Sequence, residues 1–183
     1  MRQLTPMRAE PDAAAEQVSE ALPGEPLTAA EQRNGWVRVE TAYDYVGWVE
    51  ASALGGDPDE GWLHPTAADP VEYARSLVGT PYRWGGMSER GIDCSGLVHM
   101  SFRATGRLVP RDAHLQEAAG EPVDDPRPGD LVSYGNEDGA DHVAFWLGDG
   151  RILHATGRRG VCAVLEEPEP LELRARRRRF FRF

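Results

Sequence analysis

The chain has 183 residues, of which 40% are hydrophobic, so it is long enough for one or two globular domains with a sizeable core. Its formal net charge of -10 argues against nucleic acid as the main partner. No stretch approaches the roughly 18 apolar residues of a transmembrane helix. The two cysteines require no disulfide scaffold and form no Cys-x-x-Cys metal motif.

Residues 1–56 have the pattern of short β-strands. Asn34-Gly35 is a strong tight-turn signal and precedes the alternating segment Trp36–Val39. A second short strand is expected over residues 45–49, and Pro23-Gly24 indicates a further turn. About five short strands in this length predict a small all-β barrel.

A change of composition separates this part from the rest of the chain. Residues 55–61, followed by His64-Pro65, are dominated by Gly, Pro and acidic residues, which is typical of a linker. We therefore place a linker at residues 57–68 and a second domain at residues 69–183.

Three helices are expected at the start of the second domain. Asp69-Pro70 suits a helix start, because Asp caps the first turn and Pro fits within it, and Gly79 ends this helix. A second helix is expected from about Cys94 to Thr105, and a short third one over residues 113–119.

Strand patterns dominate from Gly129 to the C-terminus. They cover residues 130–134, 142–147, 151–155 and 161–165, and the C-terminal tail. Helices followed by strands predict an α+β domain with a largely antiparallel sheet.

The tail carries six of the twenty Arg residues, and the chain has no Lys. A basic tail could bind an anionic polymer. The alternative, which we favour, is a final strand whose Arg side chains pair with the acidic body of the protein, because Phe180, Phe181 and Phe183 fit a packed strand.

Cys94 lies at an expected helix start, within Gly91-Ile92-Asp93-Cys94-Ser95-Gly96. Unpaired backbone N–H groups and the positive end of the helix dipole favour thiolate over thiol there, and a neighbouring His would lower the thiol pKa further. The alternative is a buried structural cysteine. We expect Cys162, in the apolar segment Val161–Val164, to be inert and in the core.

Two histidines favour the interpretation of Cys94 as a reactive residue over that of a structural cysteine. His142 begins one expected strand, and His154 lies in the next strand, across the turn Gly148-Asp149-Gly150. A hairpin would bring the two imidazoles together, so that one takes the thiol proton and the other orients it. This is the arrangement of nucleophile, base and orienting group.

The series of motifs resembles the NlpC-type cell-wall cysteine peptidases, a papain-like family. The resemblance covers about residues 69–183 and rests on the order and spacing of Thr80–Gly86, Asp93–Val98, Pro110–Asp112, Pro128–Val132 and the strands of His142 and His154. It implies that Cys94 is the nucleophile, His142 the general base and then acid, and His154 the orienting residue. It also implies that Tyr82 lies beside the thiol and helps stabilise the oxyanion; packing against Trp84 is the alternative.

Residues 1–56 resemble the bacterial SH3-like module that precedes the catalytic domain in one branch of this family, the γ-D-glutamyl-L-diamino-acid endopeptidases, or dipeptidyl-peptidase VI. The resemblance rests on Pro6–Pro11, Gly35–Val39 and Tyr43–Trp48. In this branch the module closes one end of the groove, and the enzymes release L-Ala-γ-D-Glu from peptides with a free N-terminal L-Ala.

The resemblance implies a pocket for that free amine. Its candidate residues are Glu10, Tyr45 and Asp93, with Ser95 and Trp84 lining the same end of the groove. Glu10 is alternatively a surface carboxylate, Tyr45 a barrel-packing residue and Asp93 only a helix cap. Where this branch often has a substrate-binding Ser, the chain has Ala113.

A recycling enzyme for murein peptides is therefore expected, with no metal or organic cofactor and no nucleic-acid or membrane partner. No apolar run follows the N-terminus as in a secretory signal, so we expect a cytoplasmic location, although a trimmed secreted form would look the same. The sequence does not indicate an oligomeric state, and a monomer is the default.

Three rival readings stay open at this point. The first is a secreted D,L-endopeptidase that acts on intact peptidoglycan, with the SH3-like module as an anchor. The second is a wall-binding module without catalytic activity. The third is a metal site built from both cysteines with His142 and His154, whose spacing fits no compact zinc motif.

Overall fold

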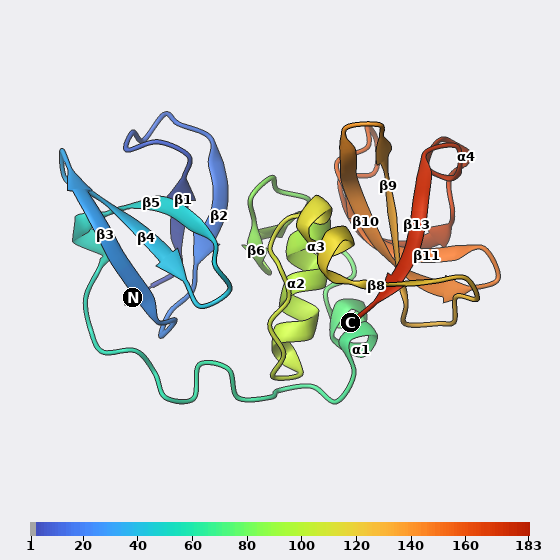
Figure 1. Ribbon diagram of the computed structural model, residues 1–183, viewed down its shortest axis with the longest axis horizontal. Coiled ribbons are helices and arrows are strands. Elements are labelled where there is room, and N and C mark those ends of the chain that lie inside the picture. Colours follow the sequence, from blue (N-terminus) through green and yellow to red (C-terminus); the bar gives the residue numbers. More distant parts are fainter. Residues whose placement is uncertain (1–2) are drawn as a thin grey trace.

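The computed structural model describes residues 3–183 and has two parts joined by a long linker (Figure 1). The first part is a five-stranded antiparallel sheet in the order β2-β1-β5-β4-β3. Its strands are β1 (Thr5–Arg8), β2 (Gln17–Ala21), β3 (Leu27–Arg33), β4 (Trp36–Thr41) and β5 (Val46–Glu50). The first two residues of the expected first domain lie outside the described part of the chain.

The expected turn at Asn34-Gly35 joins β3 to β4. Both residues have positive φ, 50° and 83°, as a two-residue hairpin turn of this kind requires. Met7, Val39 and Val49 are fully or almost fully buried and form a separate small core in this part. The prediction of a small all-β unit is confirmed.

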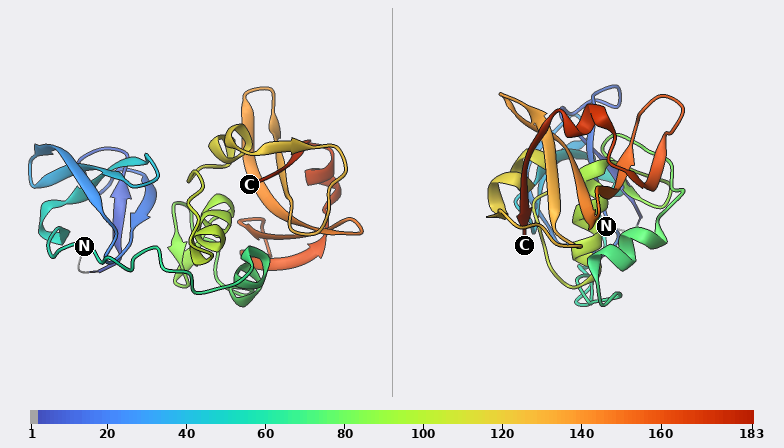
Figure 2. Two further views of the ribbon diagram at one scale, coloured as in Figure 1. Left: turned by 60° about the horizontal axis from the view of Figure 1, so that its bottom comes forward. Right: turned by 90° about the vertical axis from the view of Figure 1, so that its right-hand side faces the viewer.

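The linker follows the 3-10 turn η1 (Ala51–Ala53) and contains no helix or strand before residue 70. Figures 1 and 2 show it passing along the outside of the molecule between the two parts.

The second part is an α+β unit whose main sheet has six antiparallel strands in the order β12-β11-β10-β9-β13-β8. Within residues 3–183, no helix is long and apolar enough to cross a membrane. The helices are α1 (Pro70–Ser76), α2 (Cys94–Ala104), α3 (Ala113–Ala119) and α4 (Leu171–Arg174), and the strands are β6 (Met87–Ser88), β7 (Gly91–Ile92), β8 (Glu121–Val123), β9 (Leu131–Asn136), β10 (Gly139–Gly148), β11 (Arg151–Thr156), β12 (Ala163–Pro168) and β13 (Arg177–Arg182).

The expected helix signals act as the sequence indicates. Asp69 caps α1 by accepting a hydrogen bond of 2.9 Å from the Glu72 N–H. Gly106, with a φ of 78°, follows the C-cap of α2. No sequence pattern predicted β8 or α4, because segments of three and four residues carry too little periodicity.

The main core lies between α2 and one face of the six-stranded sheet. Leu97 of α2 is fully buried there with Phe145 of β10 and Leu153 of β11. A second cluster covers the opposite face, where Tyr134 and Ile152 pack beneath Leu173 of α4. Packing on both faces fixes the start of α2 against the strands that carry the two histidines.

The Arg-rich tail forms β13, between β9 and β8, as the favoured reading expects. Phe181 is fully buried in the core. The Arg side chains form ion pairs with the acidic body, among them Arg177 with Glu169, Arg178 with Glu117 and Arg182 with Asp130. The tail is therefore an integral strand of the sheet.

The two parts contact each other directly along β2. The buried Glu20 carboxylate accepts a hydrogen bond of 2.8 Å from the Met87 N–H, and Gln17 donates one of 3.1 Å to the Gly85 carbonyl. The ring of Tyr43 lies 4.3 Å, centroid to centroid, from that of His99 in α2. These contacts place the first part beside the start of α2.

Replacing Phe181 by Ala should lower the free energy of unfolding by about 3–5 kcal/mol, because a fully buried aromatic ring is lost and a cavity remains. The matched change Leu171→Ala, at a side chain exposed by 78%, should shift it by no more than about 0.5 kcal/mol. Urea unfolding of both variants measures the difference. Equal effects would contradict the placement of β13 in the core.

Candidate functional site

A pocket of about 440 Å³ opens between the two parts at the start of α2. The first part supplies Glu16, Val18 and Tyr45 to its wall. The second part supplies Trp84, Asp93, Cys94, Ser95, Asp112, Ala113, His114, Ala140 and Asp141.

Cys94 is the first residue of α2, and its side chain is buried at the pocket wall. Asp93 caps the helix by accepting a hydrogen bond of 2.7 Å from the Gly96 N–H. Backbone groups of Ser95 and Val143 approach the thiol, and both lower its pKa. The sulfur therefore faces the backbone of the residue that follows His142.

The expected thiolate is not what this environment favours. Burial, and after it the negative charge of Asp93, raise the pKa of Cys94 to about 12. The helix start and the Arg111 charge act in the expected direction, but desolvation outweighs them because the thiol is almost fully buried. Burial therefore works against the thiolate that the helix start favours.

The two histidines lie together, as the hairpin implies. β10 and β11 pair antiparallel across Gly148-Asp149-Gly150, where all three residues have positive φ. His142 Nε2 and His154 Nδ1 are 2.8 Å apart, and His154 Nε2 lies 3.0 Å from Glu167 Oε1. Glu167 was not expected at this site, because its contact with His154 depends on the pairing of β11 with β12.

Because Nε2 of His142 is engaged with His154, Nδ1 of His142 is the nitrogen that can accept a proton from a reaction partner. Burial and the neighbouring His154 lower the pKa of His142 to about 3, so its ring is neutral. Among the described residues, Cys94 and His142 are not joined by a hydrogen bond, although the thiol lies against Val143. A side-chain rotation must bring them together, and such bonds are often long before substrate binds.

Tyr82 lies near the thiol. Burial, and after it the charge of Cys94, raise the pKa of the Tyr82 phenol, which stays protonated and able to donate. The ring also packs against Gly157, where an added Cβ would come within 3.0 Å of it. Its role at the oxyanion stays a prediction.

A buried ion pair organises the start of α2. Arg111, exposed by 1%, binds both oxygens of Asp93, at 2.9 and 2.7 Å, and donates to Ser95 Oγ at 2.9 Å. Asp93 also accepts from the backbone N–H of Gly85 at 2.8 Å. The Asp93 carboxylate is thus fully engaged as a helix cap and ion-pair partner, which leaves no lone pair for a substrate amine.

Glu10, the expected amine-binding carboxylate, is not at the pocket. It is exposed in the loop between β1 and β2, whereas Glu16, immediately before β2, lines the wall. Tyr45 does line the pocket, as expected, and its hydroxyl donates a hydrogen bond of 3.2 Å to the Val18 carbonyl. The error arose because two glutamates in one loop cannot be distinguished before the strand register is known.

Trp84 and Ser95 also line the pocket, as expected. The Trp84 ring is exposed by 59%, and its Nε1 donates a hydrogen bond of 2.7 Å to Glu16 Oε1, which joins the two parts across the pocket. Two further lining residues, Asp112 and His114, flank Ala113 and were not expected to take part.

The pocket is acidic. Glu16, Asp93, Asp112 and Asp141 line it; Asp93 pairs with the buried Arg111 and Asp141 with Arg176. Burial raises the pKa of Asp112 above its usual range, which indicates that its carboxyl is partly withdrawn from water. An acidic pocket of this kind favours a cationic group.

Cys162 was expected in the core, but it is a free, exposed cysteine immediately before β12. The apolar segment that suggested burial begins in a loop, and only Ala163 and Val164 lie in β12. Residues 3–183 contain no group of three or more His, Cys, Asp or Glu arranged to hold a metal ion.

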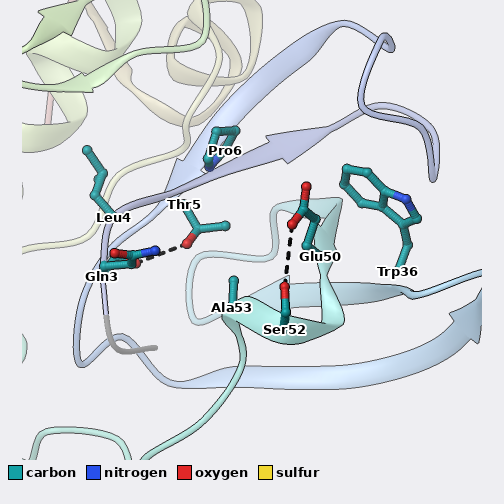
Figure 3. Close-up of a pocket in the computed structure, with 8 residues that line it drawn as sticks. All are labelled: Gln3, Leu4, Thr5, Pro6, Trp36, Glu50, Ser52 and Ala53. Atoms are coloured by element: carbon teal, nitrogen blue, oxygen red, sulfur yellow. Dashed lines mark hydrogen bonds between the residues drawn. The ribbon is translucent and has the colours of Figure 1, made fainter.

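A separate hollow of about 200 Å³ lies on the first part (Figure 3). Trp36 and Glu50 face it, and a hydrogen bond of 3.4 Å joins Ser52 to Glu50 at its edge. Its lining has no thiol and no imidazole, so it offers neither a nucleophile nor a general base.

Two family models match the chain. The model described as the NlpC/P60 family matches residues 79–171, and the model described as the bacterial dipeptidyl-peptidase SH3 domain matches residues 7–54. The two matches cover the two parts of the structure.

Two curated relatives are named as dipeptidyl-peptidases. A γ-D-glutamyl-L-lysine dipeptidyl-peptidase of Bacillus subtilis is 36% identical over 149 residues, covering 78% of this chain and 48% of the relative. A dipeptidyl-peptidase 6 of Lysinibacillus sphaericus is 33% identical, covering 74% of this chain and 51% of the relative. The chain thus spans about half the length of these curated relatives.

A solved structure also covers both parts. The crystal structure of an NlpC/P60 family protein from Bacillus cereus aligns with 100% of this chain and 61% of its own, with a TM-score of 0.60 and 23% identity. At that identity the likeness concerns the fold, and it includes the α+β unit with its preceding β unit.

The neutral state of Cys94 can be tested by the ultraviolet absorbance of thiolate. The difference between wild type and Cys94→Ala should be absent at neutral pH and appear only in strong alkali, because burial raises the pKa of Cys94 to about 12. The exposed Cys162 is present in both proteins and cancels. A difference that persists at neutral pH and vanishes only in acid would instead show a thiolate–imidazolium pair.

Arg111→Met should lower the free energy of unfolding by about 3–5 kcal/mol, because it leaves the buried Asp93 carboxylate without its partner. Arg38→Met, at an exposed strand position of the first part, is the matched control and should be near neutral. The double variant Arg111→Met/Asp93→Asn should recover part of the loss in thermal or urea unfolding. No recovery would argue that Arg111 acts by packing alone.

Proposed function

Because this chain belongs to the NlpC/P60 family, we propose that it is a cysteine peptidase that hydrolyses peptides derived from peptidoglycan. The observation that carries the proposal is the buried Cys94 at the start of α2, set against the strand that begins the His142–His154–Glu167 chain. Together these residues would supply a nucleophile, a base and an orienting group.

The neutral thiol and neutral imidazole define how the reaction begins. As the Cys94 sulfur attacks the carbonyl carbon, Nδ1 of His142 takes the thiol proton, and His154 with Glu167 stabilises the resulting imidazolium. The carbonyl oxygen becomes an oxyanion, which we expect the Cys94 backbone N–H and the Tyr82 hydroxyl to stabilise.

The intermediate then collapses in two stages. Its C–N bond breaks, the leaving amine takes the proton from His142, and a thioester to Cys94 remains. Water attacks the thioester while His142 accepts a proton from it. The C–S bond breaks, the carboxylic acid product leaves, and the proton returns to the sulfur.

The acidic pocket supports a substrate with a free N-terminal amine. Glu16 and Tyr45 of the first part line the acidic pocket together with Asp112. Relatives at 33–36% identity are named dipeptidyl-peptidases, one of them for a γ-D-glutamyl-L-lysine bond. We therefore assign cleavage of the γ-D-Glu–L-diamino acid bond in L-Ala-γ-D-Glu peptides, with Glu16 facing the ammonium group.

This assignment favours recycling of free peptides over digestion of intact wall. In intact peptidoglycan the L-Ala nitrogen is an amide and carries no charge. A closed acidic end would gain nothing from that amide and has no room for the attached sugar. The secreted endopeptidase reading requires an open groove at the position that β2 and Trp84 occupy.

The test follows hydrolysis of L-Ala-γ-D-Glu-diaminopimelate by mass spectrometry, beside the N-acetylated peptide and with Cys94→Ala as the inactive control. Release of L-Ala-γ-D-Glu from the free-amine peptide alone is expected. Equal cleavage of both peptides would overturn the amine pocket, and no cleavage of either would overturn the proposed substrate.

Glu16→Gln should lower kcat/KM for the free-amine peptide by about tenfold or more, because one charge-assisted contact of about 1.5–3 kcal/mol is lost. Gln can still accept the Trp84 hydrogen bond, so the wall should keep its shape. Glu10→Gln is the matched control, and we expect no change because Glu10 is exposed away from the pocket. The opposite pattern would restore Glu10 as the amine-binding residue.

A further inference from the structure

A second hollow, of about 300 Å³, lies next to the acidic pocket along β10. Both hollows include Asp141 in their walls, and the second is the one that His142 lines. Its lining residues come from β10, the end of β11, α4 and the start of the tail: Asp141, His142, Thr156, Arg158, Glu172, Leu173 and Arg176.

The second hollow also adjoins Tyr82. Thr156 and Arg158 line it, and Gly157 between them packs against the Tyr82 ring. His142 and Tyr82 are two of the residues assigned to the reacting carbonyl. This hollow therefore lies next to two of the groups that would act on the carbonyl. If the N-terminal half of a substrate fills the acidic pocket, the leaving residue must lie here.

Two guanidinium groups distinguish this hollow. Arg158 donates to Glu167 Oε2 at 2.8 Å and lies 3.6 Å from Glu172. Arg176 pairs with Asp141. In the described part of the chain neither Nε makes a side-chain hydrogen bond, so each guanidinium retains N–H donors. Because each guanidinium is already held by one carboxylate, its remaining donors are oriented before a ligand arrives.

We propose that this hollow is the subsite for the residue on the amine side of the scissile bond, and that Arg176 and Arg158 bind a carboxylate of that residue. The inference rests on the proposed function and specifies its substrate class. Such a subsite selects a diamino acid with a second carboxylate, such as diaminopimelate, over lysine.

The chemistry of the two residues supports this choice. Guanidinium groups match carboxylates in geometry and form charge-assisted hydrogen bonds with them. Glu172, at the exposed edge of the hollow, suits the side-chain ammonium that both diamino acids carry. Lysine offers that ammonium alone, whereas diaminopimelate adds the carboxylate that the arginines would bind.

Binding to the inactive Cys94→Ala protein tests the subsite without requiring turnover. Titration calorimetry should compare L-Ala-γ-D-Glu-meso-diaminopimelate with L-Ala-γ-D-Glu-L-lysine. The diaminopimelate peptide should bind about tenfold more tightly, the effect of one charge-assisted hydrogen bond. Arg176→Gln in this background should reduce the ratio toward one, by weakening the diaminopimelate peptide alone.

Two further variants separate the subsite from general charge effects. Glu172→Gln should raise the ratio, because it removes a negative charge from the hollow and releases Arg158. Arg38→Gln removes an exposed arginine on the first part and should leave the ratio unchanged. Arg158 is not substituted, because it also holds Glu167 behind His154.

Equal affinities for the two peptides, tighter binding of the lysine peptide, an unchanged ratio in Arg176→Gln, or no binding of either peptide would each overturn the subsite. Cleavage by the wild-type protein is measured separately. Cleavage of both peptides with equal affinity would overturn the subsite and leave the proposed function standing.

Discussion

The buried ion pair between Arg111 and Asp93 is the interaction on which the rest of the site depends. Arg111 fixes the carboxylate that caps α2, and it also donates to the Gly86 carbonyl and to Ser19 Oγ of the first part, both at 3.3 Å. One guanidinium therefore ties together the helix that carries Cys94, the loop beside Trp84 and the domain that closes the groove. A buried pair adds little net stability compared with an apolar replacement, but it imposes one geometry.

The same burial determines the charge state of the reacting groups. It raises the pKa of Cys94 and lowers that of His142, so it favours the neutral form of each group before a carbonyl is present. The charge that forms on His142 during attack is offset through His154 by Glu167, whose pKa is held below its usual range by hydrogen bonds from Arg158 and His154 against the effect of burial. The negative charge thus lies two hydrogen bonds from the His142 ring, where it favours the imidazolium.

Local signals sufficed for much of this arrangement. The caps of α1 and α2, the Asn34-Gly35 turn and the hairpin of His142 and His154 each depend on residues adjacent in sequence. The remainder depends on pairings that sequence patterns do not contain. Glu167 reaches His154 only through the register of β12 on β11, and Glu16 rather than Glu10 reaches the pocket through the docking of β2. Arginine is usually found at the surface, and the apolar segment around Cys162 suggested burial. Tertiary packing instead buries Arg111 and leaves Cys162 exposed.

The two hollows on either side of His142 differ in charge, and the difference gives the groove a direction. The closed end has unmatched carboxylates, whereas in the other hollow two arginines face two acidic side chains. A peptide with an ammonium group at one end and a carboxylate beyond the scissile bond gains from both contacts only in one orientation. Bound the other way, its ammonium would meet guanidinium groups and its carboxylate the acidic wall. Charge order along the groove, together with the closed end, would therefore fix which bond reaches Cys94.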